Sequence, residues 1–147
     1  MATVVVDASV AVKWVVAEEG SNQALALRRE RHLTAPDLIV AECANILWKK
    51  ARRNELTADE AAFAARLLQK SGMNLRPMLG FLEVATRLAV ELDHPAYDCV
   101  YLAMAQIEGT SFVTADDRLL RKVRAMPAHP MAACVVGLHE SPSRPSP

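Results

Sequence analysis

The chain has 147 residues, of which 52% are hydrophobic and 23% charged, a balance typical of one globular domain rather than a disordered chain. The 17 basic residues balance the 17 acidic ones, so an overall positive charge for nucleic acid is absent and any such contact needs local basic patches. No apolar run reaches the roughly 20 residues that span a bilayer, and the N-terminus lacks a signal-peptide pattern, so we expect a cytoplasmic protein without a membrane segment.

The cysteines also favour a cytoplasmic location. Cys43, Cys99 and Cys134 are odd in number, widely spaced and set among apolar residues. This pattern is typical of small buried thiols in a reducing cytoplasm and has no metal-ligand spacing.

The predicted elements alternate between strands and helices. In chain order we expect a strand at 3–6, helices at 10–20 and 21–31, a strand at 33–36, helices at 38–54 and 58–71, a weak strand at 73–75, helices at 80–93 and 96–108, a strand at 110–114, a helix at 116–125 and an edge strand at 134–136. This alternation predicts an α/β fold with a central, mostly parallel sheet flanked by helices on both faces. We expect residues 1–140 to form one domain and the Pro/Ser-rich residues 141–147 to be a disordered tail.

Local signals fix several helix ends. Asp37 is expected to cap the helix at 38–54, and Thr57 to Glu60 match a capping box for the next helix. Within the first of these helices, Glu42, Asn45 and Lys49 lie three and four residues apart, so their side chains can act together on one face.

Two carboxylates follow predicted strands. Asp7 ends the β-branched run VVV, which is typical of a strand buried on both faces, and Asp116 follows the strand at 110–114. Reactive crevices of open α/β sheets lie beyond the carboxyl ends of strands, so both positions suit a functional site. Each residue could instead serve only as a helix cap, and the adjacent Asp117 leaves open which carboxylate enters a site.

Two further carboxylates lie on predicted helices. Glu42 sits among apolar residues, although a solvated helix face explains it equally well. Asp98 is the only charged residue in the apolar run AYDCVYLAMA, where an unpaired buried carboxylate costs several kcal/mol. The helix dipole stabilises a carboxylate at that position by only about 0.3–1 kcal/mol, which is less than the cost of burial and therefore favours a functional role for Asp98.

Together the four carboxylates predict a particular chemistry. The chain-crossing rules permit Asp7, Glu42, Asp98 and Asp116 to face one crevice, where they would repel one another without a cation. Oxygen ligands without cysteine or histidine suit Mg²⁺ or Mn²⁺ rather than Zn²⁺. A divalent metal ion held by carboxylates, with coordination positions open for water and phosphate, can catalyse phosphodiester hydrolysis.

Four segments in this order resemble the PIN domain family, and in particular its small VapC-type toxin ribonucleases. The matching stretches are VVVDAS at 4–9, AECANIL at 41–47, YDCVYLAMA at 97–105 and VTAD at 113–116. The resemblance extends over about residues 3–137 and implies a PIN-like three-layer fold and a Mg²⁺- or Mn²⁺-dependent endoribonuclease. It also implies an RNA substrate, a homodimer and a cognate antitoxin as partner.

The resemblance further implies roles for individual residues. Asp7, Glu42, Asp98 and Asp116 match the acidic quartet that binds metal, and Thr114 matches a hydroxyl position that assists in the same pocket. The four histidines have no common spacing, so we interpret them as structural or surface residues. The basic stretches at 49–53 and 118–124 are typical of solvated helix ends, with phosphate contact as a second interpretation.

Three other functions compete with this hypothesis. A receiver-like phosphoacceptor domain requires paired acidic residues after the first strand and a lysine at the end of a late strand. Here Ala8 and Ser9 follow Asp7, and no lysine follows Lys122. A haloacid-type phosphatase requires a second aspartate two residues after the first, and Ser9 occupies that position. A catalytically silent binding module that grips a basic partner with the same acidic pocket stays open.

Overall fold

The protein is described by a computed structural model over residues 1–141. One sheet of five parallel strands forms its centre, in the order β3-β2-β1-β4-β5. The strands are β1 (Thr3–Val6), β2 (His32–Pro36), β3 (Asn74–Arg76), β4 (Ser111–Thr114) and β5 (Val135–Gly137). The predicted α/β class and parallel sheet are therefore confirmed, and the weak strand at 73–75 and the edge strand at 134–136 both exist.

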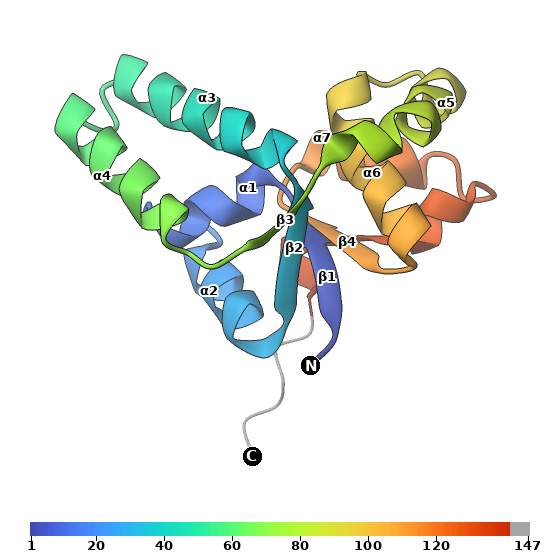
Figure 1. The fold of residues 1–147 in the computed structure, drawn as a ribbon, viewed down its shortest axis with the longest axis horizontal. Helices are drawn as coiled ribbons and strands as arrows, with labels where there is room; N and C mark the ends of the chain where they lie inside the picture. Colours follow the sequence, from blue (N-terminus) through green and yellow to red (C-terminus); the bar gives the residue numbers. More distant parts are fainter. Residues whose placement is uncertain (142–147) are drawn as a thin grey trace.

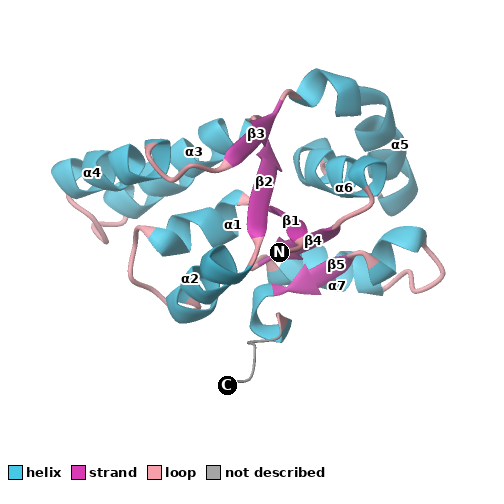
Figure 2. Ribbon diagram, turned by 60° about the horizontal axis from the view of Figure 1, so that its bottom comes forward, coloured by secondary structure: helices cyan, strands magenta, loops and turns pink. Residues whose placement is uncertain are grey.

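Helices cover both faces of this sheet. Figure 2 shows α1 to α4 on one side of the strands and α5 to α7 on the other. The helices are α1 (Ala8–Ala11), α2 (Ser21–Glu30), α3 (Leu38–Arg52), α4 (Ala58–Gln69), α5 (Leu82–Leu92), α6 (Ala96–Glu108) and α7 (Asp117–Arg124), with short 3₁₀ turns at Val12–Trp14, Met78–Phe81, Pro130–Ala133 and Leu138–Glu140. Figure 1 shows the paired helices α3 and α4 on one flank of the strands and α5 and α6 on the other.

The core is built on β1, as the VVV run predicts. Val5 packs with Phe112 and the apolar residues of α6, whereas Val4 and Val6 face the opposite way and pack with Leu27 of α2. Side chains of a strand alternate between the two faces, so a strand covered on both sides needs apolar residues throughout. Burial of each valine contributes roughly 1.5 kcal/mol or more, and this fixes the strand that carries Asp7.

Two sequence predictions about helix ends need correction. The helix predicted at 10–20 is much shorter, because α1 passes into the 3₁₀ turn at Val12–Trp14 and helical structure then stops. Val15 and Val16 follow at that point, and β-branched residues lower helix propensity. Asp37 precedes α3, but its side chain makes no capping bond there and instead accepts a hydrogen bond from the Met78 amide at 3.2 Å.

One other local prediction, the capping box, is confirmed. Thr57 and Glu60 form the expected capping box at the start of α4. In residues 1–141 no helix is both long and apolar enough to cross a bilayer. The tail predicted to be disordered at 141–147 lies, from residue 142 onward, outside the described residues.

Candidate metal centre

The strand order places a crevice beside Asp7. The chain moves outward from β1 through β2 to β3, then returns to the other side of β1 to form β4 and β5. Helices that leave neighbouring strands toward opposite faces open a crevice at the carboxyl ends, and here this reversal lies between β1 and β4. Because Val6 pairs with Val113 in register, Asp7 and Thr114 are the adjacent residues at that edge.

A cavity of about 420 Å³ occupies this edge of the sheet. It lies between α3 and α6, which flank the carboxyl ends of the strands (Figure 1). Four carboxylates line it: Glu42 of α3, Asp98 of α6, and Asp7 and Asp116, which follow β1 and β4. Asn45, Lys49 and Tyr97 also line the cavity. Glu42, Asn45 and Lys49 therefore share one face of α3, as their spacing predicts.

Asp7 is the most enclosed of these carboxylates, with only 7% of its surface exposed. The hydroxyls of Ser9 and Thr114 each donate to it at 2.5 Å, one to each carboxylate oxygen, and the Val10 amide donates at 3.3 Å. Burial raises the pKa of Asp7 to about 6, against the hydrogen bonds from these hydroxyls, which lower it. Asp7 is therefore mostly ionised at neutral pH, and a nearby positive charge would lower its pKa further.

Glu42 and Asp98 approach from the two helices on either side. The Tyr101 hydroxyl donates to Oε1 of Glu42 at 2.5 Å, and Nε2 of His94 lies 2.5 Å from Oδ2 of Asp98. Burial raises the pKa of Glu42, the Tyr101 hydrogen bond lowers it, and the charge of Asp98 raises it further. The charge of Asp98 also raises the pKa of Asp7, so Asp98 repels both of the other carboxylates.

Asp116 lines the same cavity while capping α7. Its Oδ1 accepts from the amides of Arg118 at 3.0 Å and Leu119 at 3.3 Å. Asp117 is exposed and is not part of the cavity wall. Thr114 lies just beneath, where its buried hydroxyl donates to Asp7 and accepts from the Asp116 amide at 3.0 Å.

The donor chemistry of this cavity fits a hard divalent cation. Its ligating groups are carboxylate oxygens with an amide and hydroxyls beside them, which is the set that Mg²⁺ and Mn²⁺ prefer. As the side chains stand, no three Asp, Glu, His or Cys groups within residues 1–141 converge on one point closely enough to hold a metal. Each carboxylate is instead held by its own hydrogen-bond donors, so metal binding requires side-chain movement toward a common centre.

Three residues of this neighbourhood escaped the sequence analysis. Ser9, His94 and Tyr101 each contact one of the four carboxylates, although the histidine was expected to be only structural or at the surface. His94 and Tyr101 lie four residues before and three residues after Asp98, a helical spacing that offered a signal. The Tyr101 contact with Glu42 joins residues 59 apart in the chain, and no local pattern indicates it.

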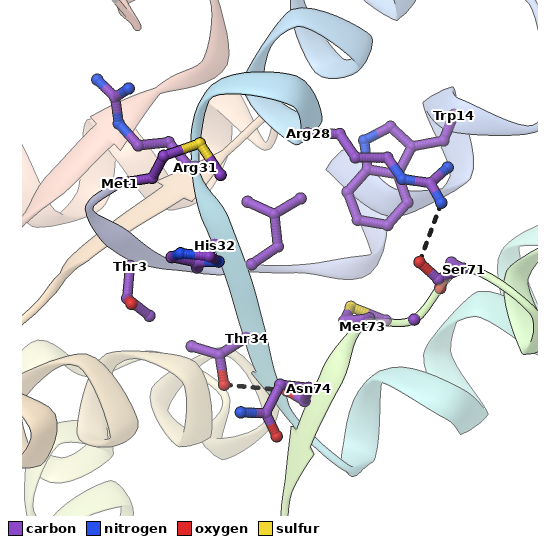
Figure 3. A pocket seen from close by; sticks show the side chains of 12 residues that line it. Met1, Thr3, Trp14, Arg28, Arg31, His32, Thr34, Ser71, Met73 and Asn74 are labelled. Atoms are coloured by element: carbon purple, nitrogen blue, oxygen red, sulfur yellow. Dashed lines mark hydrogen bonds between the residues drawn. The ribbon is translucent and has the colours of Figure 1, made fainter.

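A second cavity, of about 440 Å³, lies at the opposite edge of the sheet, around the first residues of β1, β2 and β3. Figure 3 shows Arg28 beside the Trp14 ring, with a hydrogen bond to the Ser71 carbonyl at 2.9 Å. Arg31 and His32 add basic groups, and no carboxylate of residues 1–141 lines this cavity. Among the described residues it therefore lacks the carboxylate ligands that Mg²⁺ and Mn²⁺ prefer, and the carboxylate cavity is the candidate centre.

Comparison with known proteins agrees with the fold and the motifs. The family model of the PIN domain matches residues 4–125. "Ribonuclease VapC3" of Pyrobaculum aerophilum is 35% identical over 125 residues, covering 83% of this chain and 95% of that protein. "Ribonuclease VapC9" of Mycobacterium tuberculosis is 31% identical over 116 residues, covering 79% of this chain and 87% of that protein.

A solved structure shows the same architecture. The crystal structure of PAE2754 from Pyrobaculum aerophilum superposes with a TM-score of 0.67 at 22% identity, covering 94% of this chain and 90% of that one. The family match includes most of β1, all of β4 and all four carboxylates that line the cavity. The chain therefore belongs to the PIN domain family.

Proposed function

We propose that this protein is a Mg²⁺- or Mn²⁺-dependent endoribonuclease that hydrolyses RNA phosphodiester bonds. The observation that carries the proposal is the meeting of Asp7, Glu42, Asp98 and Asp116 in one cavity at the switch point of the sheet. Relatives named ribonucleases, at 31–35% identity over most of their length, support RNA as the substrate.

The four carboxylates would hold the metal. Such an ion supplies positive charge beside the scissile phosphate and lowers the pKa of a nearby water. Ser9 and Thr114 keep the Asp7 carboxylate oriented through their hydroxyls. Burial is the main cause that raises the pKa values of Asp7 and Glu42, and the charge of Asp98 adds to it; a bound cation would offset both effects, which supports a cation at this position.

Other residues of the wall suit an RNA strand. Lys49 offers a positive charge to a phosphate, and Asn45 offers an amide on the same face of α3. Tyr97 is 68% exposed at the cavity, where a ring can stack on an unpaired base. These groups suit a single-stranded substrate whose backbone passes over the carboxylates.

The same pocket suits a protein inhibitor. A guanidinium binds carboxylates with two parallel hydrogen bonds, so an arginine of a small partner fits among Asp7, Glu42 and Asp98. We therefore propose that the protein is the toxin of a toxin–antitoxin pair, whose antitoxin inserts arginine into this cavity. A partner that binds elsewhere and leaves cleavage unimpaired would contradict this part of the proposal.

We also propose that the protein forms a homodimer. Its support is a run of exposed apolar side chains along the turn before α5 and on α5 itself, where Leu79 is 81%, Leu82 63% and Val90 79% exposed. A second copy laid against this face would cover them.

The test of the proposed function is RNA cleavage with controlled metal. The protein, freed of any bound partner by denaturation and refolding, is incubated with a mixed-sequence single-stranded RNA in EDTA, then with added Mg²⁺ or Mn²⁺. Cleavage should be absent in EDTA and return with either ion. Full cleavage after exhaustive chelation would refute the metal mechanism, and metal binding without cleavage of any RNA would favour the silent binding module.

A further inference from the structure

Tyr101 connects the two helices that carry Glu42 and Asp98. It lies on α6, is 1% exposed, and donates its hydroxyl to Oε1 of Glu42 on α3 at 2.5 Å. Its ring packs edge-on against Phe112 of β4, with centroids 5.6 Å apart and planes at 73°. The hydroxyl is therefore held in place by the core and cannot follow the carboxylate if Glu42 turns away.

The free end of Glu42 faces the cavity without another partner. Only Oε1 accepts a hydrogen bond within the described part of the chain, and Oε2 is left for a ligand. A glutamate has three rotatable side-chain bonds, so an unrestrained Glu42 would spend much of its time turned away from the other carboxylates. A fixed donor on one oxygen selects the rotamers that present the other oxygen to the cavity.

The position of Tyr101 also determines where the Glu42 carboxylate lies relative to Asp98. Asp98 and Tyr101 are three residues apart on α6 and so lie on the same side of that helix. The hydrogen bond thus ties the Glu42 carboxylate of one helix to the helix that bears Asp98. No other hydrogen bond within residues 1–141 joins the Glu42 side chain to α6.

We propose that Tyr101 is a positioning residue of the metal centre, which acts through Glu42 to gather the carboxylates around the ion. This inference rests on the proposed function, since it concerns the same centre. Hydrogen-bond partners of metal ligands orient the ligand, and their loss typically lowers metal affinity about 10- to 100-fold. Tyr101 touches neither substrate nor metal in this account.

The test measures Mn²⁺ affinity by calorimetry or by electron paramagnetic resonance, apart from any cleavage assay. Tyr101→Phe removes the hydroxyl and keeps the ring that packs on Phe112, so the unfolding midpoint should stay close to that of the wild type. Its Mn²⁺ dissociation constant should rise about 10- to 100-fold. Cleavage by Tyr101→Phe should fall at low Mn²⁺ and recover most of its rate at saturating Mn²⁺.

Two further variants separate positioning from a general structural role. Tyr97→Phe removes a hydroxyl from the same helix and the same cavity wall without removing a hydrogen bond to a carboxylate, so its Mn²⁺ affinity should not change. Glu42→Gln removes the proposed ligand itself. If Tyr101 acts through Glu42, adding Tyr101→Phe to Glu42→Gln should cause no further loss of Mn²⁺ affinity.

The outcomes distinguish this inference from the proposed function. A wild-type protein that binds no Mn²⁺ refutes the metal centre itself. A wild-type protein that binds Mn²⁺, with Tyr101→Phe binding equally well, refutes only the role of Tyr101. Additive losses in the double variant would also refute it, because the hydroxyl would then act independently of Glu42.

Discussion

Asp7 and Asp116 each serve two purposes. Both follow a strand, both accept amide hydrogen bonds at the start of a helix, and both line the carboxylate cavity. From the sequence, helix capping and a position in a functional site were alternative interpretations of each residue. In the structure each residue caps a helix and also lines the cavity. The first turn of a helix supplies positive partial charge, which stabilises a carboxylate that also faces the cavity.

Lys49 is the one lysine or arginine side chain in the wall of the carboxylate cavity within the described residues. If it contacts an RNA phosphate, Lys49→Gln should raise the KM for RNA by about fivefold, equivalent to about 1 kcal/mol, with little change in kcat. The slope of log KM against log salt concentration should fall by about one. Steady-state cleavage measured between low and moderate salt checks both numbers.

Lys70→Gln provides the matched control. Lys70 is exposed at the end of α4 and lies outside the cavity wall, so the KM and its salt slope should not change. Equal effects of the two substitutions would mean that Lys49 contributes only to the overall charge.

The four acidic positions could be predicted from sequence because strand ends and isolated charges in apolar helices are local patterns. Asp98 is the clearest example, as a single charge within an apolar run. The donors that hold these carboxylates could not be predicted equally well. The spacing of Tyr101 from Asp98 places both on one side of α6, but the contact of Tyr101 with Glu42 depends on how α6 packs beside α3.

The helical elements are tied together by a small ion-pair network away from the cavity. Glu18, in the loop before α2, contacts Lys13 at 3.2 Å and Lys50 of α3 at 2.5 Å. Burial alone would raise the pKa of Glu18, but the hydrogen bonds and charges of the two lysines outweigh burial and lower it. The network therefore anchors α3, the helix that presents Glu42 and Lys49, to the segment after α1.

Glu18→Gln should lower the free energy of unfolding by about 0.5–1 kcal/mol at pH 7, as expected for a partly exposed ion pair. Because the pKa is lowered in the folded state, the stabilisation is complete above the ordinary value of 4.5 and disappears as the pH falls through the folded pKa. Urea unfolding of both proteins at pH 7 and in acid measures the difference, which should shrink in acid.

Glu19→Gln is the control for this experiment. Glu19 is adjacent and exposed, and within residues 1–141 its carboxylate forms no ion pair. A loss of stability in Glu19→Gln equal to that in Glu18→Gln would indicate a change in net charge rather than a specific network.

Most elements could be predicted because hydrophobic periodicity and caps act over a few residues. The errors occur where distant contacts override local ones. Asp37 has the sequence of a helix cap, but the turn before α5 brings the Met78 amide to its carboxylate. The helix after Asp7 is short because its valines favour extended structure, even though its first turn packs well in the core.

The whole molecule places its polar chemistry at one edge of the sheet. The strand order 3-2-1-4-5 sends the helices after β1 and β4 to opposite faces, and carboxylates from four parts of the chain then line one cavity at the carboxyl ends. The sequence predicted parallel strands without this order. Strand order depends on which long-range pairing is most stable, which residue patterns along a single strand do not encode.

Asp98→Asn separates a metal-binding role of this carboxylate from a role in capping or stabilising α6. The side chain of Asp98 is 29% exposed, so the substitution should fold, and an asparagine oxygen can still accept from His94. The variant removes one charge that raises the pKa values of Asp7 and Glu42, so its metal-free stability should be unchanged or higher by up to about 1 kcal/mol.

The decisive measurement is metal-dependent RNA cleavage by this variant, at Mn²⁺ concentrations that saturate the wild type. We expect cleavage by Asp98→Asn to fall at least about 100-fold while its melting temperature stays at or above that of the metal-free wild type. A variant that melts earlier but cleaves RNA at the wild-type rate would contradict the account, because Asp98 would then serve the helix and not the site.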